Sequence, residues 1–247
     1  MTPHLNRALI TWVCLALCSW MLVFDRGAHA QSITFRNASS SGSAVTPIAF
    51  LGAGPAVSGV GILNPAYPAG WTPGDILICI VESRDNTAPT MPAGWTLLNS
   101  ASRGGSHRAS LFWRKAQAGD VTTPAVNHGA ATAAAAILGF TGIDSASNFD
   151  VVNSFTASNA DLTTEAGAIT TVTANAMLVF TAHMADDHAS LAAPVGSAPW
   201  TNGLFYSNAG SGGLSIGAYY GLRPAAGAQA AVSATRTGAA NAVSHGA

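Results

Sequence analysis

Short apolar runs alternate with clusters of Gly, Pro, Asn and Ser roughly every ten residues along most of the chain. The runs are rich in Val, Ile, Thr and aromatic residues, and no window shows a sustained helical apolar stripe with caps. This pattern is typical of an all-β sandwich or barrel, so we expect an all-β, β-sandwich or jelly-roll-like fold. The clearest predicted strands are Ile76–Ser83, Trp95–Ser100, Ala109–Ala116, Ala168–Thr173, Met177–His183 and Leu214–Leu222.

Two runs depart from simple alternation. Ile76–Val81 is apolar at every position, which predicts a central strand covered on both faces. Cys79 lies inside that run, and we expect it to behave as a small buried hydrophobic residue rather than as a reactive thiol. Ala130–Gly139 favours a helix on alanine propensity, but we predict a strand because of its place in an internal repeat.

That repeat relates the two halves of the chain. Gly74–Glu82 is similar to Asn175–His183, and the spacing suits a duplicated β module. A polar loop, a Trp-Thr pair and a strand with two adjacent aromatic residues follow each segment; the pairs are Trp95-Thr96 with Trp200-Thr201, and Phe112-Trp113 with Tyr219-Tyr220. The sequence therefore predicts two pseudo-repeats, 45–143 and 144–247, which either share one sandwich or form two.

The second repeat lacks the segment that ends the first. Gly129–Ala133 parallels Gly238–Ala242, and the first half then continues into an apolar closing strand at Ala135–Phe140. In the second half only Ser244–Ala247 remain after the equivalent of Ala134. Either that strand is very short or the chain stops before its natural end, and an edge left unpaired in this way recruits partners.

The first thirty residues are typical of a secretory signal peptide. Ala8–Phe24 is an apolar run without an acidic residue, and Ala28-His29-Ala30 has the small-x-small form of a signal-peptidase site. An uncleaved anchor helix is the alternative, but the run is at the short limit for a membrane span. We therefore expect cleavage after Ala30, no membrane span in the mature chain, and a secreted, periplasmic or cell-surface location in a bacterial host. In the N-terminal extension 31–44, a strand at Ser32–Arg36 can pair inside the fold or extend to another subunit.

Charged residues make up only 9% of the chain, against about 25% in ordinary soluble domains. Ten Lys and Arg against eleven Asp and Glu form no basic face, which excludes nucleic acid as the partner. The 49% hydrophobic content excludes a disordered tail. Removal of residues 1–30 leaves Cys79 as the single cysteine, so the fold relies on its core and not on a disulfide. A surface with few charges has little electrostatic defence against association, which favours assembly over catalysis.

One short motif matches a hydrolase signature. Residues 213–217 read Gly-Leu-Ser-Ile-Gly, the form of the serine-hydrolase nucleophile elbow, which requires a helix after the serine. A strand-like run follows here instead, and no Asp or Glu occurs after Asp187. We expect Ser215 to be structural; the weak catalytic candidates, in a different triad order, are Ser215, His183, Asp186, Asp187 and His188.

The segment from His183 to His188 is also the densest group of potential metal ligands. Asp oxygen and His nitrogen suit zinc or a similar divalent ion, and the weak candidate ligands are His183, Asp186, Asp187 and His188. Turns favour Asp for local backbone hydrogen bonds without any metal. We therefore expect a solvated turn and no cofactor.

Adjacent aromatic residues on a strand point to opposite faces of a sheet. One member of each pair then lies in the core, and the other faces outward, where Trp113, Tyr219 or Tyr220 can stack on a sugar ring or a partner chain. The alternative is that loops or the sister repeat cover these rings.

Three segments carry a family likeness: Ile48–Gly54, then Pro68–Leu77 with its Pro-Gly-Asp, then Pro92–Thr96, which reads Pro-Ala-Gly-Trp-Thr. In these motifs the chain, from about Thr46 onward, resembles a group of uncharacterised secreted or phage-associated all-β structural proteins of the tail-fibre-like kind. The resemblance implies a surface or structural role and supplies no catalytic residues. The sequence thus predicts a secreted or cell-surface structural or binding protein that adheres or self-associates through strand edges and aromatic patches. The alternatives are a carbohydrate-binding module and a secreted, esterase-like serine hydrolase that uses Ser215.

Overall fold

The computed structural model describes residues 28–37, 47–103, 107–144, 146–152, 156–158, 163–196, 199–208 and 212–239. These residues form antiparallel β-sheets and no helix, which confirms the predicted all-β, sandwich-like fold. Within those ranges the structure contains no helical segment that can cross a bilayer. The predicted signal peptide lies outside the described residues except for Ala28, His29 and Ala30.

The first half of the chain forms a six-stranded sheet, here called sheet 1, in the order β2-β9-β5-β7-β6 with β3 beside β9. Its strands are β2 (Ala49–Ala53), β3 (Val57–Gly59), β5 (Ile76–Ser83), β6 (Thr96–Arg103), β7 (His107–Lys115) and β9 (Ala133–Thr141). Every residue of β5 is buried, as its unbroken apolar run predicts. The alanine-rich run is strand β9 and not a helix, because its backbone pairs with β5 along its length and its small side chains fit both covered faces.

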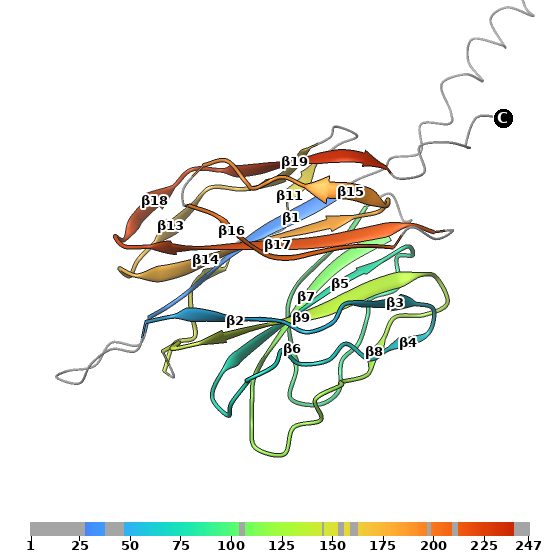
Figure 1. Cartoon of the computed structure of the whole chain (residues 1–247), viewed down its shortest axis with the longest axis horizontal. Helices are drawn as coiled ribbons and strands as arrows, with labels where there is room; N and C mark the ends of the chain where they lie inside the picture. The colour runs from blue at the N-terminus through green and yellow to red at the C-terminus, as the bar shows by residue number, and fades with distance from the viewer. Residues whose placement is uncertain are drawn as a thin grey trace, which may run out of the picture.

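A second six-stranded sheet, here called sheet 2, has the order β10-β1-β14-β17-β16 with β11 beside β1. Its strands are β1 (Ala28–Phe35), β10 (Phe149–Val152), β11 (Thr156–Ser158), β14 (Ala176–Met184), β16 (Thr201–Asn208) and β17 (Leu214–Arg223). The two sheets stack face to face (Figure 1).

Short strands cover the outer faces. An outer sheet beyond sheet 2 has the order β12-β19-β15, and two further pairs are β4 with β8 and β13 with β18. Their bounds are β4 (Ile62–Leu63), β8 (Val126–Asn127), β12 (Thr163–Ala166), β13 (Ile169–Thr171), β15 (His188–Leu191), β18 (Gly227–Gln229) and β19 (Val232–Ala239). The predicted strand Ala168–Thr173 is the short β13.

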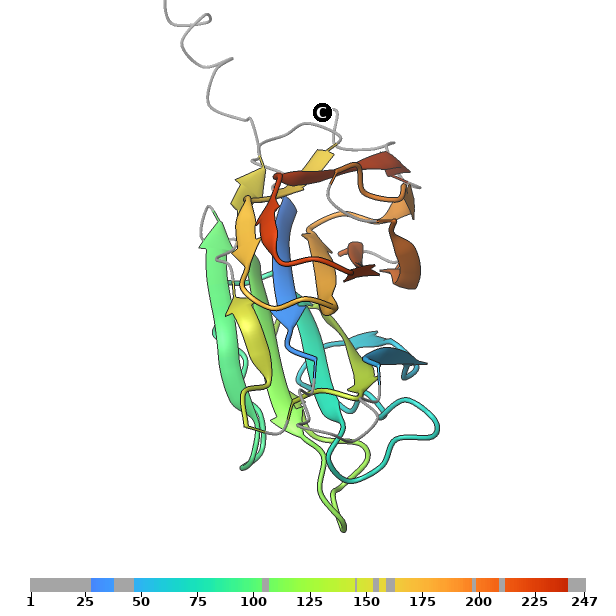
Figure 2. The ribbon, with the colours of Figure 1, turned by 90° about the vertical axis from the view of Figure 1, so that its left-hand side faces the viewer.

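The two large sheets share one strand plan, and the N-terminal strand completes the second. β5 lies between β7 and β9 in sheet 1, and β14 lies between β17 and β1 in sheet 2. Ile76 of β5 is opposite Phe140 of β9, and Met177 of β14 is opposite Phe35 of β1. β1 (blue in Figure 2) therefore takes the place in sheet 2 that the closing strand β9 holds in sheet 1. The predicted N-terminal strand pairs inside the fold, which is one of the two alternatives for Ser32–Arg36.

Bulges recur at matching places in the two sheets. The extra residue is Leu98 where β6 pairs with β7, and Gly203 where β16 pairs with β17. On the other side of each sheet it is Leu51 in β2 and Asp150 in β10. Because bulges bend and twist a strand locally, the matching bulges are a further likeness between the two sheets.

The two sheets share one central core, so the halves form one sandwich and not two. Two trios of aromatic rings meet where Phe35 contacts Phe140, with ring centroids 4.7 Å apart. Each trio takes two rings from one sheet and one from the other; the trios are Phe35, Phe149, Trp113 and Phe140, Phe50, Tyr220. This interleaving ties the halves together through their largest side chains.

Additional layers cover the outer faces of both sheets. Tyr67 of a loop and Val126 of β8 cover sheet 1, and Leu191 and Val232 of the outer sheet cover sheet 2. Cys79 lies under the loops, fully buried, and burial raises the pKa of its thiol. The structure thus bears out its expected role as a core residue.

Candidate functional site

The candidate nucleophile and one candidate base lie on opposite faces of sheet 2. Ser215 of β17 is opposite Met184 of β14, and His183 is opposite Ile216. Neighbouring residues on a strand point to opposite faces, and Ile216 belongs to the central core. His183 therefore faces sheet 1 while Ser215 faces the outer sheet, and the two form no nucleophile–base pair.

Ser215 fastens the turn after β14 to strand β17. Its buried Oγ accepts a hydrogen bond from the His188 amide and donates one to the Asp186 carbonyl, each at 2.8 Å. The His188 ring is directed elsewhere, with Nε2 3.4 Å from Nη1 of Arg236. Burial, with the charge of Arg236 in addition, lowers the pKa of His188 to about 4, so the ring is neutral near pH 7. These contacts describe a structural serine.

The candidate metal ligands are not assembled. No group of three or more His, Cys, Asp or Glu side chains in the described part of the chain is placed to hold a metal ion. His183 points into the central core, whereas Asp187 and His188 belong to the turn and strand on the other side of sheet 2. Asp187 and His188 are buried, so the expected solvated turn is in fact largely covered.

The three aromatic candidates are covered by neighbouring layers. Tyr219 is 5% exposed under the outer sheet, and its hydroxyl donates to the Leu191 carbonyl. Trp113 and Tyr220 pack against the central core. The structure therefore agrees with the alternative prediction, in which neighbouring parts of the chain cover these rings.

A different aromatic group lies in the loops over sheet 1. The rings of Trp71 and Trp95 stand edge-on to Tyr67, with centroid distances of 5.4 and 6.2 Å. Both indoles are half-buried and Tyr67 is buried. Burial, with the charge of Asp120 in addition, raises the pKa of Tyr67 to about 12.

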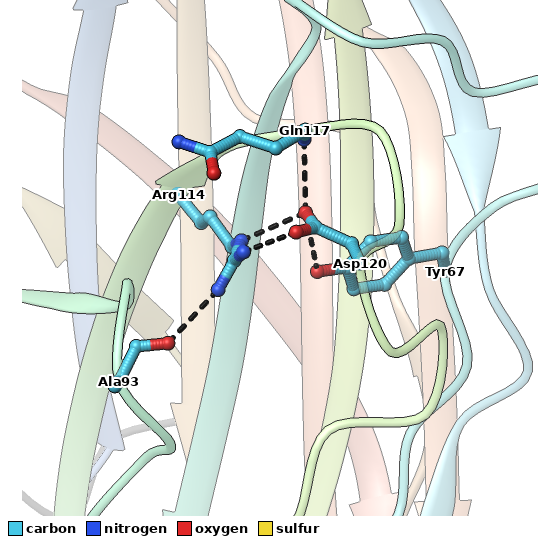
Figure 3. Close-up of polar contacts among 5 residues, drawn as sticks. All are labelled: Tyr67, Ala93, Arg114, Gln117 and Asp120. Carbon is cyan, nitrogen blue, oxygen red and sulfur yellow. Dashed lines mark hydrogen bonds and ion pairs between the residues drawn. The ribbon is translucent and has the colours of Figure 1, made fainter.

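Asp120 is the centre of a hydrogen-bond network beside these rings (Figure 3). Arg114 of β7 donates to both carboxylate oxygens of Asp120 and, through Nη1, to the Ala93 carbonyl at 2.9 Å. The Gln117 amide and the Tyr67 hydroxyl donate to the same carboxylate at 3.0 and 3.4 Å. Burial alone would raise the pKa of Asp120, but the bonds and charge of Arg114 outweigh it and lower the pKa. This network links β7 to the loops that contain Tyr67, Ala93 and Asp120.

The most unusual group of side chains lies at one end of the central core. We call Glu82, His29, His107 and His183 the histidine–glutamate cluster. All four lie between the sheets with at most 2% of the residue exposed. Oε2 of Glu82 is 3.7 Å from Nδ1 of His183, and the rings of His29 and His107 are 6.1 Å apart in an edge-on arrangement.

Burial favours the uncharged forms of Glu82 and His183. Desolvation raises the pKa of Glu82 well above its usual value, and the nearby charge of Arg84 offsets only part of the rise. Desolvation, with His29 in addition, lowers the pKa of His183 to about 3. These shifts favour the protonated form of Glu82 and the neutral form of His183, because separating charge in a water-free interior is costly.

Arg84 holds this end of the sandwich closed. Its Nη1 donates to the carbonyls of Ala185 and Gly213, each at 3.0 Å, and so links sheet 1 to two loops of sheet 2. With the cluster covered in this way, no substrate reaches Glu82 or His183 in the structure described. Glu82 and His183 are thus shielded from solvent, each with 0% of its surface exposed.

Sequence reasoning missed Glu82, His29 and His107, although a signal was present. Inward-facing positions on a strand recur every second residue. Glu82 continues the row of Ile76, Ile78 and Ile80, and His183 ends the matching row of β14. A polar residue at the end of several such rows predicts a polar end to the core.

Comparison of the chain with protein-family models, with curated proteins and with solved structures finds no match. The resemblance to secreted and phage-associated structural proteins stays a prediction.

Proposed function

We propose that the protein is a secreted or cell-surface structural component that associates through the free edges of its two large sheets. The observation that carries this proposal is the pair of edge strands β6 and β16. Within the described ranges, β6 pairs only with β7 and β16 only with β17. Each strand therefore has one side whose backbone groups can pair with another chain.

Apart from one bulge each, these edges lack the features that usually protect a sheet from association. Natural edge strands carry lysine, proline or inward-pointing charges. The sequences of β6 and β16 contain no proline or lysine, and Arg103 at the end of β6 is their one charged residue. The bulges at Leu98 and Gly203 lie near the start of each strand, so most of each edge stays regular.

The burial of the catalytic candidates and the low content of charged residues support the same proposal. The sites that a catalytic reading would use are buried or separated, as described for Ser215, His183 and Glu82. A chain with 9% charged residues has few like charges to keep copies apart. Pairing of edge strands with another copy, or with a partner that presents an open strand, satisfies the free backbone groups.

The test is sedimentation velocity of the purified secreted protein over a wide range of concentrations. We expect the wild type to form oligomers as concentration rises. The variants Asn202→Lys and Leu97→Lys place a charge at an exposed position of each edge, and they should shift the protein towards the monomer. Val172→Lys is the matched control, because Val172 is 64% exposed but lies outside any strand. A wild type that stays monomeric throughout, or a control that dissociates the oligomer equally, would contradict the proposal.

Glycan binding is the second candidate, carried by the half-buried indoles of Trp71 and Trp95. Two tryptophans held by a buried tyrosine present apolar surface that can pack on a sugar ring. We expect Trp71→Ala to abolish retention on a polysaccharide gel, and Leu97→Ala, at an exposed position near Trp95, to leave it unchanged. Retention that survives Trp71→Ala would rule out this use of the indole.

A further inference from the structure

Each large sheet has one long edge strand and one edge that is divided into two short strands. In sheet 1 the long edge is β6, and the opposite edge consists of β2 and β3, which both pair with β9. In sheet 2 the long edge is β16, and the opposite edge consists of β10 and β11, which both pair with β1. Among the described residues, each sheet therefore offers one uninterrupted edge.

The divided edges carry features that hinder pairing with another chain. Pro55, which has no backbone N–H, lies between β2 and β3. Asp150 is the bulge residue of β10, and its carboxylate accepts hydrogen bonds from the Val172 amide and the Thr173 hydroxyl at 2.8 and 2.9 Å. Proline, bulges and covering segments are the ways in which natural sheets protect their edges. These features direct association to β6 and β16.

The stacking of the sheets places β6 and β16 on opposite sides of the sandwich. β16 lies over the divided edge of sheet 1, because the hydroxyls of Tyr206 in β16 and Ser58 in β3 share a hydrogen bond of 2.8 Å. β6 is at the other end of sheet 1. Beside β6, the strand of sheet 2 that contacts sheet 1 is β10, whose Phe149 ring lies 5.1 Å from the ring of Trp113 in β7. Each side of the sandwich therefore presents one long edge over one divided edge.

We propose that copies of this chain assemble into an open-ended fibre, in which each copy uses β6 on one side and β16 on the other. This inference rests on the proposed function and commits it to one partner, a second copy of the chain. A closed dimer uses one surface patch of each copy. Pairing at one edge here leaves the edge on the opposite side open, so a further copy can always add.

The likeness of the two edges makes a second copy the suitable partner. After their bulges, Asn99–Arg103 of β6 and Leu204–Asn208 of β16 each contribute five residues in unbroken register with the neighbouring strand. Neither strand contains Asp or Glu, and Arg103 is their one charged residue. The edges thus carry no row of like charges that would repel another copy, and every copy supplies strands of matching length.

The strand plan also determines the spacing in such a fibre. Each sheet is five strands wide along its main path. Because paired strands lie about 4.8 Å apart, successive copies are expected about 24 Å apart, with their strands across the fibre axis. Since each sheet has one long edge, a continuous sheet covers two copies and then ends, and the next junction lies in the other layer.

The first experiment blocks the edges one at a time in the purified protein. Leu97→Lys puts a charge on β6, Asn202→Lys puts one on β16, and the double variant carries both. We measure size by sedimentation velocity at high concentration and shape by negative-stain electron microscopy. We expect unbranched fibres for the wild type, nothing longer than a dimer for either single variant, and monomers for the double variant. Val121→Lys, at a 69% exposed position outside any strand, is the control and should form fibres like the wild type.

A mixing experiment tests whether one fibre uses both edges. A single variant keeps one working edge and should end a growing fibre, so Leu97→Lys added to the wild type should shorten the fibres as its share rises. The double variant has neither edge and is the matched control. At the same share it should leave the fibre length unchanged.

The outcomes separate the fibre from the association on which it rests. A wild type that stays monomeric at every concentration contradicts the association itself. A closed wild-type dimer that one single variant abolishes and the other leaves intact supports association and overturns the fibre. Fibres of wild-type length from Leu97→Lys or from Asn202→Lys would also overturn it, since the copies would then meet through another surface.

Discussion

Replacement of Glu82 by glutamine tests whether the histidine–glutamate cluster is neutral. Glu82→Gln keeps the shape of the side chain and removes its proton equilibrium. In the folded chain the pKa of Glu82 is raised, so the protonated carboxyl is the favoured form.

The sign of the pH dependence follows from the direction of that shift. Below the ordinary pKa near 4.5, both folded and unfolded chains hold the proton, and stability does not change with pH. Above it the unfolded chain ionises and the folded chain does not, so the wild type loses about 1.4 kcal/mol of unfolding free energy per pH unit until the folded pKa is reached. Glu82→Gln has no carboxyl group to ionise, so it does not lose this stability as pH rises.

The assay is urea unfolding of both proteins at several pH values between 4 and 8, followed by tryptophan fluorescence. We expect the free-energy difference to move in favour of Glu82→Gln as pH rises. An ionised pair of Glu82 and His183 would behave in the opposite way, because removal of one charge would leave its partner unpaired and cost about 3–5 kcal/mol at neutral pH. A Glu82→Gln variant that is less stable by such an amount, or a difference that does not change with pH, would refute the neutral cluster.

Three further predictions concern the central core, the hydrogen-bond network of Asp120 and the buried Ser215. Phe35→Ala and Phe140→Ala should each lower the unfolding free energy by about 3–5 kcal/mol in urea titrations, whereas Val121→Ala, at a 69% exposed position, should change it by less than about 0.5 kcal/mol. Asp120→Asn should cost about 1.5–3 kcal/mol at pH 7; since the folded pKa of Asp120 is lowered, the loss should shrink in unfolding measurements as pH falls through that pKa. Ser215→Ala should cost about 1–3 kcal/mol in thermal unfolding, because a buried amide loses its acceptor, and should leave any turnover of a chromogenic ester unchanged.

The all-β class and the main strands were predictable because they depend on local pattern. The apolar run of Ile76–Val81 and the turn residues around it define β5 without any knowledge of its partners. The strand at Ala133–Thr141 was predictable only from the repeat, because its alanines favour a helix when taken alone. Tertiary pairing with β5 decides the matter in the structure.

The closing strand of sheet 2 was the part that local pattern could not place. The sequence predicts a strand at Ser32–Arg36, but this segment lies far along the chain from its partner β14. Their pairing depends on the register of β1 against β14, which is a long-range property. Buried polar residues were missed for the same reason, since Glu82 and His183 meet only when the two sheets stack.

The aromatic candidates show why a prediction of two packed sheets was incomplete. Alternation along a strand correctly puts Tyr219 and Tyr220 on opposite faces. A single sandwich would expose Tyr219, but the outer sheet covers it. The number of layers depends on where the short strands β12, β15 and β19 fold back, and their own patterns are too short to show it.

The strands β6 and β16 are the long free edges only if β1 closes sheet 2 within its own chain. Hydrogen–deuterium exchange of the monomer fraction measures this directly. We predict that the amides of Ile33–Phe35 exchange as slowly as those of Leu138–Phe140 in β9, and that their protection does not depend on protein concentration. Exchange of the Ile33–Phe35 amides within minutes, or protection that appears only as concentration rises, would show that β1 does not close sheet 2 in its own chain.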